Sequence, residues 1–343
     1  MKNLLRRAFA YVVHLVGSTI IDQRTGENVG KAIIFSFGGI VKIWGLHWPF
    51  LTTEFQPSRK INYGRATLGF RTHPEVDFSR NISARPLSPQ DRVLWVILAH
   101  SNPFSLHEVL VYWKDRGVDP NDILIAYGGT VENFENLKVP NKVFVQDEQL
   151  RTKRHAEEKQ SYSAVFREVS SWMNGRNLKA VFFFEEDHLP LTDGLEKELL
   201  NRLIRDDADA LLPHLCRVDR TNSPHYVYHL SDVRFRNYWH SRSTREDRSM
   251  YFNAIITGSA WKAECIDCIA ANPEEIPMYL ELYLPSLIHH LGFRIRSFPV
   301  HESSISVTPI SISQALSFAD SGALSVHPIK FAPSIFAEAL KKR

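Results

Sequence analysis

Three consecutive acidic residues and a histidine follow an almost purely apolar stretch of this chain. The segment AVFFFEEDHLPL (180–191) predicts a buried strand that delivers Glu185, Glu186 and Asp187 at its end. Side chains alternate along a strand, so Glu185 and Asp187 share one face and Glu186 lies on the other. Two carboxylates at positions i and i+2 can grip a hard divalent cation such as Mg2+ or Mn2+. Such an ion can hold a diphosphate and stabilise it as it leaves.

The alternative for these acids is an ordinary acidic loop after a strand. Three adjacent carboxylates next to apolar residues are costly unless they have partners, which favours the metal site. A second acidic pair, Asp207-Ala208-Asp209, is a literal D-x-D. It precedes a predicted strand and so lies at the amino end of that strand, where parallel sheets do not bind ligands. We expect these aspartates to be solvated turn residues.

The elements around the acidic segment predict the sheet that positions it. Apolar or alternating runs predict strands at VLWVILAH (93–100), DILIAYGG (122–129), KVFVQD (142–147) and ADALLPHL (208–215). Helical periodicity predicts helices over residues 105–117, 155–173 and 195–206. Strands that alternate with helices indicate a mostly parallel, helix-covered sheet, which binds ligands beyond the carboxyl ends of its strands.

The first 90 residues differ from the rest of the chain in composition and in the spacing of their apolar residues. Residues 1–16 combine a basic start with an apolar stretch that is too short to span a membrane and lacks a clean cleavage site. We interpret them as an amphipathic helix packed on its own domain; the alternative is a helix lying on a membrane surface. Residues 18–70 read as small β structure divided by turn signals at 25–27 and 38–39. Residues 71–90 carry three prolines and read as a linker.

The overall composition is that of an ordinary globular protein. The chain has 343 residues, of which 44% are hydrophobic and 23% charged, with a net charge of +3. This mixture excludes wholesale disorder, a collagen-like repeat and a multi-span membrane protein, and the balanced charge argues against a dedicated nucleic-acid binder. Three cysteines argue against a secreted disulfide scaffold. We expect a cytoplasmic protein, with peripheral contact at the inner face of the membrane through residues 1–16 as the open alternative.

Two of the cysteines, Cys265 and Cys268, form a C-x-x-C pair within a predicted helix. A structural zinc site needs four ligands, and the chain has no second pair. We interpret the pair as small core residues, with a redox or metal role as the alternative.

The order of apolar strand, helix, strand, long helix and acid-tipped strand resembles a glycosyltransferase of the GT-A fold, similar to family 2. In this resemblance, Glu185-Glu186-Asp187 would be the variant of the family's D-x-D motif. The resemblance implies a nucleotide-sugar donor, carrying UDP or GDP, whose diphosphate is bridged by Mn2+ or Mg2+. It further implies a nucleotide pocket formed by Ala99, His100, Asn102, Tyr127, Asp147, Lys159 and Glu186.

Three downstream segments extend the resemblance, which covers roughly residues 92–305. NAIITGSAW (253–261) is similar to the family's turn at the donor sugar, with Gly258 and Ser259 leaving room for a ligand. YLELYLPSLIHHLGFRI (279–295) places Glu281 where inverting members carry the catalytic base; the alternative is a helix N-terminal residue favoured by the dipole. RIRSFPVHESS (294–304) places His301 where many members supply a metal-binding histidine.

Two other features remain open. The charge-rich stretch 241–251 is either a loop that closes on substrate or a solvated loop. An aromatic cluster is either a sugar-stacking face or core: Tyr226, Tyr228, Tyr238 and Trp239.

The sequence therefore predicts an α/β protein with a GT-A-like, Rossmann-type, mostly parallel sheet flanked by helices, and a small N-terminal β-rich appendage. The expected divisions are residues 1–90, a catalytic domain over 91–310, and a C-terminal tail or helix over 311–343. The predicted function is a metal-dependent, inverting glycosyltransferase that acts on a glycan acceptor in glycan or polysaccharide biosynthesis. The alternatives are a sugar nucleotidyltransferase, whose Gly-rich phosphate loop is missing after the first strand, and a non-catalytic carbohydrate-binding or scaffold protein.

Overall fold

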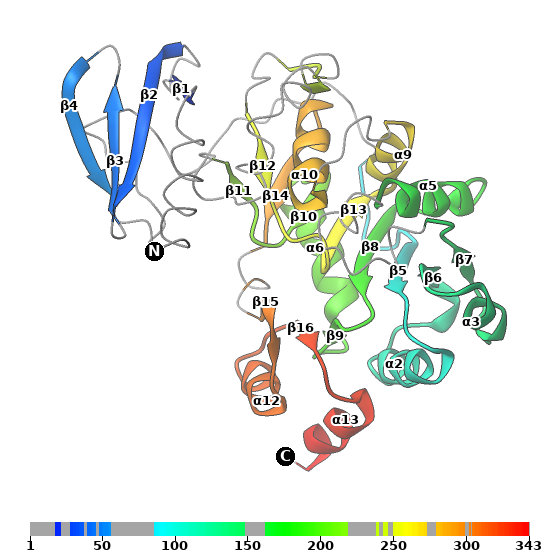
Figure 1. Ribbon diagram of the computed structural model, residues 1–343. Coiled ribbons are helices and arrows are strands. Elements are labelled where there is room, and N and C mark those ends of the chain that lie inside the picture. Colours follow the sequence, from blue (N-terminus) through cyan, green and yellow to red (C-terminus); the bar gives the residue numbers. More distant parts are fainter. Residues whose placement is uncertain are drawn as a thin grey trace. The chain divides into compact units, whose positions relative to one another are not determined.

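The computed structural model divides the chain into two units, which we describe separately (Figure 1). The first comprises Met1–Asp77, Cys216–Ser241 and Glu246–Asn253, and the second comprises Phe78–Leu215, Arg242–Arg245 and Ala254–Arg343. The structure describes residues 18–21, 28–37, 40–45, 48–55, 86–147, 162–218, 238–239, 243–245, 250–272, 279–298, 302 and 304–342.

The first unit contains an antiparallel sheet with the strand order β1-β2-β3-β4. Its strands are β1 (Ser18–Ile21), β2 (Asn28–Phe37), β3 (Ile40–Gly45) and β4 (Trp48–Phe55). They follow one another along the chain as a meander, as expected for strands separated by short turns. The same unit holds the two-stranded pair of β11 (Cys216–Arg217) and β12 (Phe252–Asn253). The β-rich N-terminal region is therefore present, while the proposed helix over residues 1–16 lies outside the described residues.

The second unit is built on a seven-stranded sheet with the order β14-β10-β13-β8-β5-β6-β7. Its strands are β5 (Val93–Ala99), β6 (Ile123–Tyr127), β7 (Lys142–Phe144), β8 (Ala180–Glu185), β10 (Ala210–Leu212), β13 (Ser259–Lys262) and β14 (Ile295–Ser297). All neighbouring pairs are parallel except those made by β13, which runs antiparallel to both β8 and β10. The mostly parallel sheet predicted from the sequence is confirmed.

Helices flank this sheet (Figure 1). They are α2 (Pro103–Asp115), α3 (Val131–Asn136), α5 (Tyr162–Met173), α6 (Leu195–Arg205), α9 (Ala263–Ala271) and α10 (Leu280–His290). Aromatic residues of β8 alternate between the two faces of the sheet. Phe182 packs edge-on against Trp95 at 5.0 Å between ring centroids, whereas Phe183 stacks on Phe166 at 5.5 Å. The strand ends at Glu185, and Glu186 and Asp187 lie in the turn that follows.

The C-terminal segment belongs to the core of this unit. It contains β15 (Ile305–Ile310), α12 (Ile312–Asp320), β16 (Ser325–Ile329) and α13 (Pro333–Lys341). Strands β15 and β16 form a small sheet with β9 (Leu189–Pro190), which follows the acidic turn. Val326 and Phe336 are fully buried within the main hydrophobic cluster. Residues beyond 310 therefore pack against the sheet and reach the end of β8.

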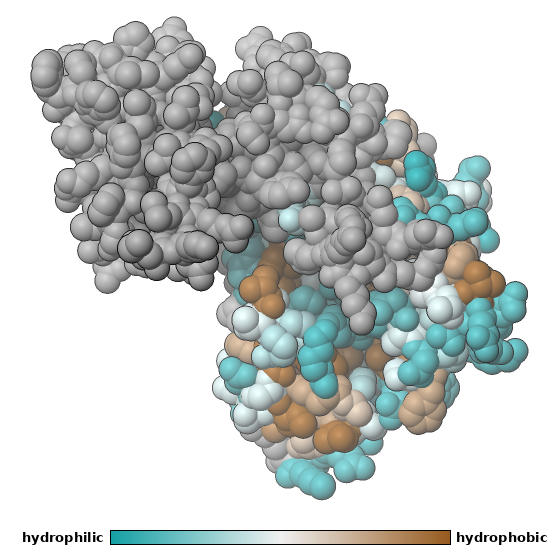
Figure 2. Space-filling model, in the orientation of Figure 1, coloured by the Kyte–Doolittle hydropathy of each residue, from teal (hydrophilic) through white to brown (hydrophobic). Residues whose placement is uncertain are grey.

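Some apolar side chains remain at the surface of the second unit. Figure 2 shows apolar surface, in brown, over the end of the unit that carries α12 and α13. Val307 and Ile335 are exposed in this segment. Isolated exposed apolar side chains are ordinary in globular proteins. Within the described residues, no helix is both long and apolar enough to cross a bilayer.

The expectation that both aspartates of the D-x-D pair are solvated is wrong for Asp209. Asp209 is fully buried, and one carboxylate oxygen lies 2.9 Å from Nζ of Lys262. The other accepts a hydrogen bond from the backbone N–H of Arg294 at 2.8 Å. The pair forms because antiparallel β13 ends at Lys262, directly beside the amino end of β10. Asp209 is a structural residue at the edge of the sheet remote from the carboxyl end of β8.

The C-x-x-C pair lies in α9, as predicted. Cys265 is buried, Cys268 is half-buried, and both are free thiols. Burial raises the pKa of both thiols, which disfavours the reactive thiolate. These observations agree with the interpretation as core residues.

Candidate active site

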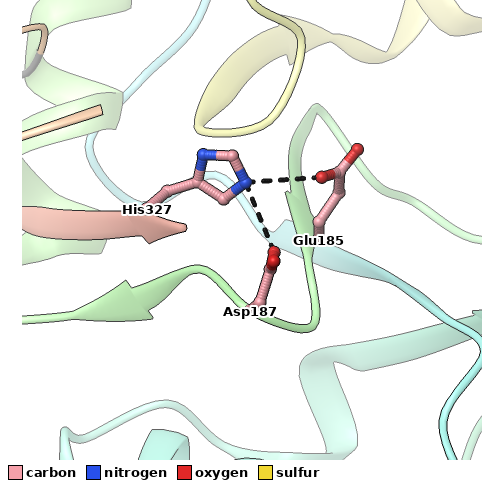
Figure 3. A group of neighbouring side chains, drawn as sticks. All are labelled: Glu185, Asp187 and His327. Atoms are coloured by element: carbon pink, nitrogen blue, oxygen red, sulfur yellow. Dashed lines mark ion pairs between the residues drawn. The ribbon is translucent and has the colours of Figure 1, made fainter. Parts of the chain in front are cut away.

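The acidic turn after β8 places two of its carboxylates on one side. Glu185 is the last residue of β8, and the N–H of His188 donates to the carbonyl of Glu185 at 3.0 Å, which closes a tight turn. Glu185 and Asp187 lie next to each other on the side that faces β16 (Figure 3). The predicted sharing of one face by these two residues is therefore confirmed.

A histidine from the C-terminal segment completes this group. Nε2 of His327, in β16, lies 3.4 Å from Oε2 of Glu185 and 3.3 Å from Oδ1 of Asp187 (Figure 3). The backbone fixes this approach, because the N–H of His327 donates to the carbonyl of Ser304 and the N–H of Ile329 donates to the carbonyl of Asp187. Strand β16 is thus hydrogen-bonded directly to the acidic turn.

The group is strongly coupled electrostatically. Burial alone would lower the pKa of His327, but hydrogen bonds and charge attraction from Asp187 and Glu185 raise it to about 9. Burial would likewise raise the pKa of Asp187, yet the hydrogen bond from His327 and the cation of Lys330 bring it below its ordinary value. In the metal-free protein, a protonated imidazole therefore holds the two carboxylates together at neutral pH.

The three side chains also fit a divalent metal ion. One donor atom from each lies within 4.8 Å of the others. Among the residues that the structure describes, no other set of three histidine, cysteine or acidic side chains comes together in this way. Ligands about 2.1 Å from an ion are about 3.0–3.4 Å apart in octahedral or tetrahedral geometry, which matches the measured separations from His327. Two carboxylates and an imidazole suit Mn2+ and related ions, and three protein ligands leave positions open for substrate oxygens.

A buried network of hydrogen bonds links the backbone of Glu185 to β16. The hydroxyl of Thr257 accepts the backbone N–H of Glu185 at 3.0 Å and lies 2.9 Å from Nδ1 of His188. Nε2 of His188 lies 2.5 Å from the hydroxyl of Ser325, two residues before His327 on the same face of β16. The His188 ring also lies 5.2 Å from the ring of His327, between centroids. The fully buried His188 therefore connects the turn before Gly258, the acidic turn and β16.

Lys330 lies immediately after β16 and brings a cation to the same place. Its Nζ lies 2.5 Å from Oδ2 of Asp187, while Oδ1 faces His327. The Lys330 side chain is 62% exposed, in contrast to the 21% of Asp187. The two oxygens of Asp187 are thus divided between a buried imidazole and an exposed ammonium group.

Glu186 points to the other side of the turn and holds the loop after β5. Its carboxylate accepts the backbone N–H groups of His100 and Ser101 at 3.3 and 3.2 Å, and the hydroxyl of Ser101 at 2.7 Å. The ring of His100 lies 3.4 Å away. This arrangement ties the tip of β5 to the tip of β8, and it satisfies the donors of that loop with an internal anion.

Most of the remaining residues expected around a nucleotide lie at or just after the carboxyl ends of β5, β6 and β7. Ala99 ends β5 and Tyr127 ends β6, and both are fully buried. The hydroxyl of Tyr127 donates to the carbonyl of Ser101 at 2.8 Å, and burial raises its pKa. Asn102 caps α2 by accepting the N–H of Ser105 at 3.0 Å. Asp147 follows β7, and Lys159 lies outside the described residues.

Three of the four downstream residues expected at the site lie in the described part of the chain. Gly258 adopts φ +81°, a left-handed conformation that favours glycine, and its N–H donates to the carbonyl of Phe183 in β8. Ser259 is buried, and its hydroxyl accepts from the indole of Trp261 at 2.6 Å. Glu281 lies in the first turn of α10, where its carbonyl accepts the N–H of Ala254. His301 lies outside the described residues.

The sequence interpretation missed His327 and Lys330. Both belong to SVHPIKF (325–331), which follows the helix α12. The sequence signal was present, since Val326 and Ile329 are strand-forming residues close to a histidine and a lysine. The predicted division into a catalytic domain over 91–310 and a tail over 311–343 leaves both residues outside the expected site.

Comparisons with known proteins give distant structural matches. No protein-family model matches the chain, and no curated protein matches it. Among solved structures, one match is a mannosyltransferase from Pyrobaculum calidifontis in complex with GDP-Man and Mn2+, at 13% identity and a TM-score of 0.35. It covers 63% of this chain and 57% of the mannosyltransferase, slightly more than half of that protein.

Two further matches belong to related classes of enzyme. A CMP:2-keto-3-deoxy-manno-octonic acid synthetase complexed with CTP is 11% identical, with a TM-score of 0.34, over 61% of this chain and 89% of that one. A glycosyltransferase involved in glycosylation of the major capsid of PBCV-1 is 8% identical, with a TM-score of 0.36, over 73% and 99%. The structures that this chain resembles are thus glycosyltransferase and nucleotidyltransferase structures. This likeness is distant, with TM-scores of 0.34–0.36, and concerns the fold alone.

Proposed function

We propose that this protein is a divalent-metal-dependent glycosyltransferase that moves a sugar from a nucleotide-diphosphate sugar to an acceptor hydroxyl of a glycan. The observation that carries the proposal is the convergence of Glu185, Asp187 and His327 at the carboxyl end of β8. Ligands of mostly parallel sheets bind at this edge, and these donors suit Mn2+ or Mg2+. The bound ion would neutralise the charge that develops on the departing diphosphate.

The chain's own residues would supply the remaining chemistry. We assign Glu281 as the base that takes the proton from the acceptor hydroxyl. The acceptor oxygen then forms a bond to the anomeric carbon as the bond to the diphosphate breaks, with inversion. Gly258 and Ser259 would border the donor sugar. The nucleotide would lie along the tips of β5, β6 and β7, near His100, Asn102, Asp147 and Lys159, with Ala99, Tyr127 and Glu186 supporting that wall.

The position of Glu186 argues against the nucleotidyltransferase alternative. An enzyme that binds a triphosphate in the loop after its first strand needs free backbone N–H groups there. Here the N–H groups of His100 and Ser101 are already taken by the Glu186 carboxylate. The grouping of two carboxylates and a histidine that could hold a metal ion likewise favours an enzyme over a purely scaffolding protein. We further propose peripheral membrane contact through residues 1–16, in a protein that works on the cytoplasmic side.

Calorimetry with UDP and GDP, each with and without Mn2+, followed by a screen of nucleotide sugars for metal-dependent hydrolysis, tests the proposal. We expect nucleotide binding that requires the metal, and loss of both binding and turnover in Asp187→Asn. Asp115→Asn, at an exposed position of α2, is the matched control and should behave like the wild type. Full metal-dependent activity in Asp187→Asn, or no nucleotide binding by the wild type, would overturn the proposal.

A further inference from the structure

We propose that Lys330 is an internal counter-cation that opposes binding of a bare metal ion but favours binding of a metal ion together with a nucleoside diphosphate. The inference deepens the proposed function and rests on it. It concerns the order in which the site is filled, and it assigns Lys330 a role that the three metal-binding side chains do not have.

The ammonium group of Lys330 lies at the carboxylate of Asp187, on the side away from His327. Nζ of Lys330 contacts Oδ2 of Asp187 at 2.5 Å, the oxygen that does not face His327. The contact is a charged one, at a carboxylate that is 21% exposed. A metal ion held by Asp187 would therefore arrive within a few ångströms of a positive charge that already neutralises this carboxylate.

The backbone next to Lys330 is hydrogen-bonded to the acidic turn. The N–H of Ile329, the preceding residue, donates to the carbonyl of Asp187 at 2.9 Å. The Cα of Lys330 is consequently held beside the acidic turn, whereas its side chain is 62% exposed to solvent. Lys330 can move its charge away from Asp187, but it remains within reach of whatever occupies the metal site.

The net charge at the site differs between the metal-only complex and the metal–diphosphate complex. A divalent ion held by two carboxylates and a neutral imidazole forms a neutral group, so the Lys330 ammonium leaves one net positive charge at the site. A diphosphate bound to the same ion supplies negative oxygens that this ammonium can approach. Lys330 therefore raises the free energy of the metal-only complex and lowers that of the metal–diphosphate complex. The two ligands become positively coupled through one side chain.

This coupling makes an unusual prediction for one substitution. In Lys330→Met, which keeps the length of the side chain and removes its charge, we expect Mn2+ alone to bind about two- to fivefold more tightly, the range of an exposed ion pair. UDP or GDP in saturating Mn2+ should bind about tenfold more weakly, as expected for the loss of a charge-assisted hydrogen bond. A purely structural role of Lys330 would weaken both.

The experiment is calorimetry of the full chain with Mn2+ alone, and then with UDP or GDP in saturating Mn2+, on the wild type and three variants. Lys330→Met should change the two affinities in opposite directions, and Lys330→Arg should restore the wild-type pattern. Lys341→Met removes the same charge from an exposed position of α13 and should change neither affinity.

Changes of the same sign in Lys330→Met, or no change, would overturn the role of Lys330 and leave the proposed function standing. Absence of any metal-dependent nucleotide binding in the wild type would instead overturn both.

Discussion

Oδ1 of Asp187 and Nε2 of His327 lie 3.3 Å apart, although they come from segments attached to two different sheets. Asp187 follows a strand of the central sheet, and His327 lies in the middle of a strand of the small C-terminal sheet. The site is therefore formed by tertiary packing rather than by one local motif. Its properties should depend on every contact that keeps the two sheets together.

The charged His327 should stabilise the metal-free protein. Its pKa is raised from 6.5 to about 9, so the stabilisation is fully present below pH 6.5 and is lost as the pH rises through about 9. Urea unfolding in EDTA should show the free energy of unfolding falling over this range by up to ~3 kcal/mol more in the wild type than in His327→Asn. Parallel pH profiles of the two proteins would contradict this prediction.

Thr257 should be needed for tight metal binding although it is not a ligand. Thr257→Val removes the acceptor for the N–H of Glu185 and a partner of His188. Residues that orient metal ligands typically contribute about 10- to 100-fold in affinity, and we expect a loss of Mn2+ affinity in that range by calorimetry. Thr308→Val, at an exposed position of β15, should bind Mn2+ as the wild type does. Equal affinities in all three proteins would show that the network does not position Glu185.

Glu281 should affect turnover and not binding. In Glu281→Gln the backbone contact of α10 to Ala254 is unchanged, because it uses the carbonyl of residue 281. Loss of a general base typically lowers kcat by about 10²- to 10⁴-fold. We expect this loss in steady-state assays, with unchanged affinity for UDP or GDP in Mn2+. Glu264→Gln, in the first turn of α9, is the matched control. A kcat equal to that of the wild type would remove Glu281 from the mechanism.

Asp209 should contribute to stability and not to metal binding. Asp209→Asn leaves the buried ammonium group of Lys262 without its charged partner, which costs about 3–5 kcal/mol in comparable sites. Asp207→Asn disturbs an ion pair with Arg294 at a carboxylate that is 60% exposed, and such a pair is worth about 0–1 kcal/mol. Urea unfolding should separate the two variants, and both should bind Mn2+ normally under native conditions. Lost Mn2+ binding in a folded Asp209→Asn protein would contradict this prediction and indicate that Asp209 takes part in metal binding.

The sequence was sufficient to predict the local part of this structure. Apolar runs predicted β5, β6 and β8. The closeness of Glu185 and Asp187 was also predictable, because the two residues are near each other in the chain, although a turn and not strand alternation brings them together. The long-range part was not predictable in this way. Periodicity does not reveal that β16 pairs with β9 and so brings His327 to the acidic turn, nor that antiparallel β13 delivers Lys262 to Asp209. Both depend on strand partners that no local pattern specifies.

The late position of β16 in the chain has a consequence for biosynthesis. During translation, the carboxylates of Glu185 and Asp187 leave the ribosome well before His327, and the central sheet can form around them first. A nascent or truncated chain that stops before Ser325 would carry the acidic turn without its imidazole and without Lys330. Under the proposed function, such a chain should remain inactive, and the protein would acquire its activity only once its C-terminal strand has been synthesised and folded into place.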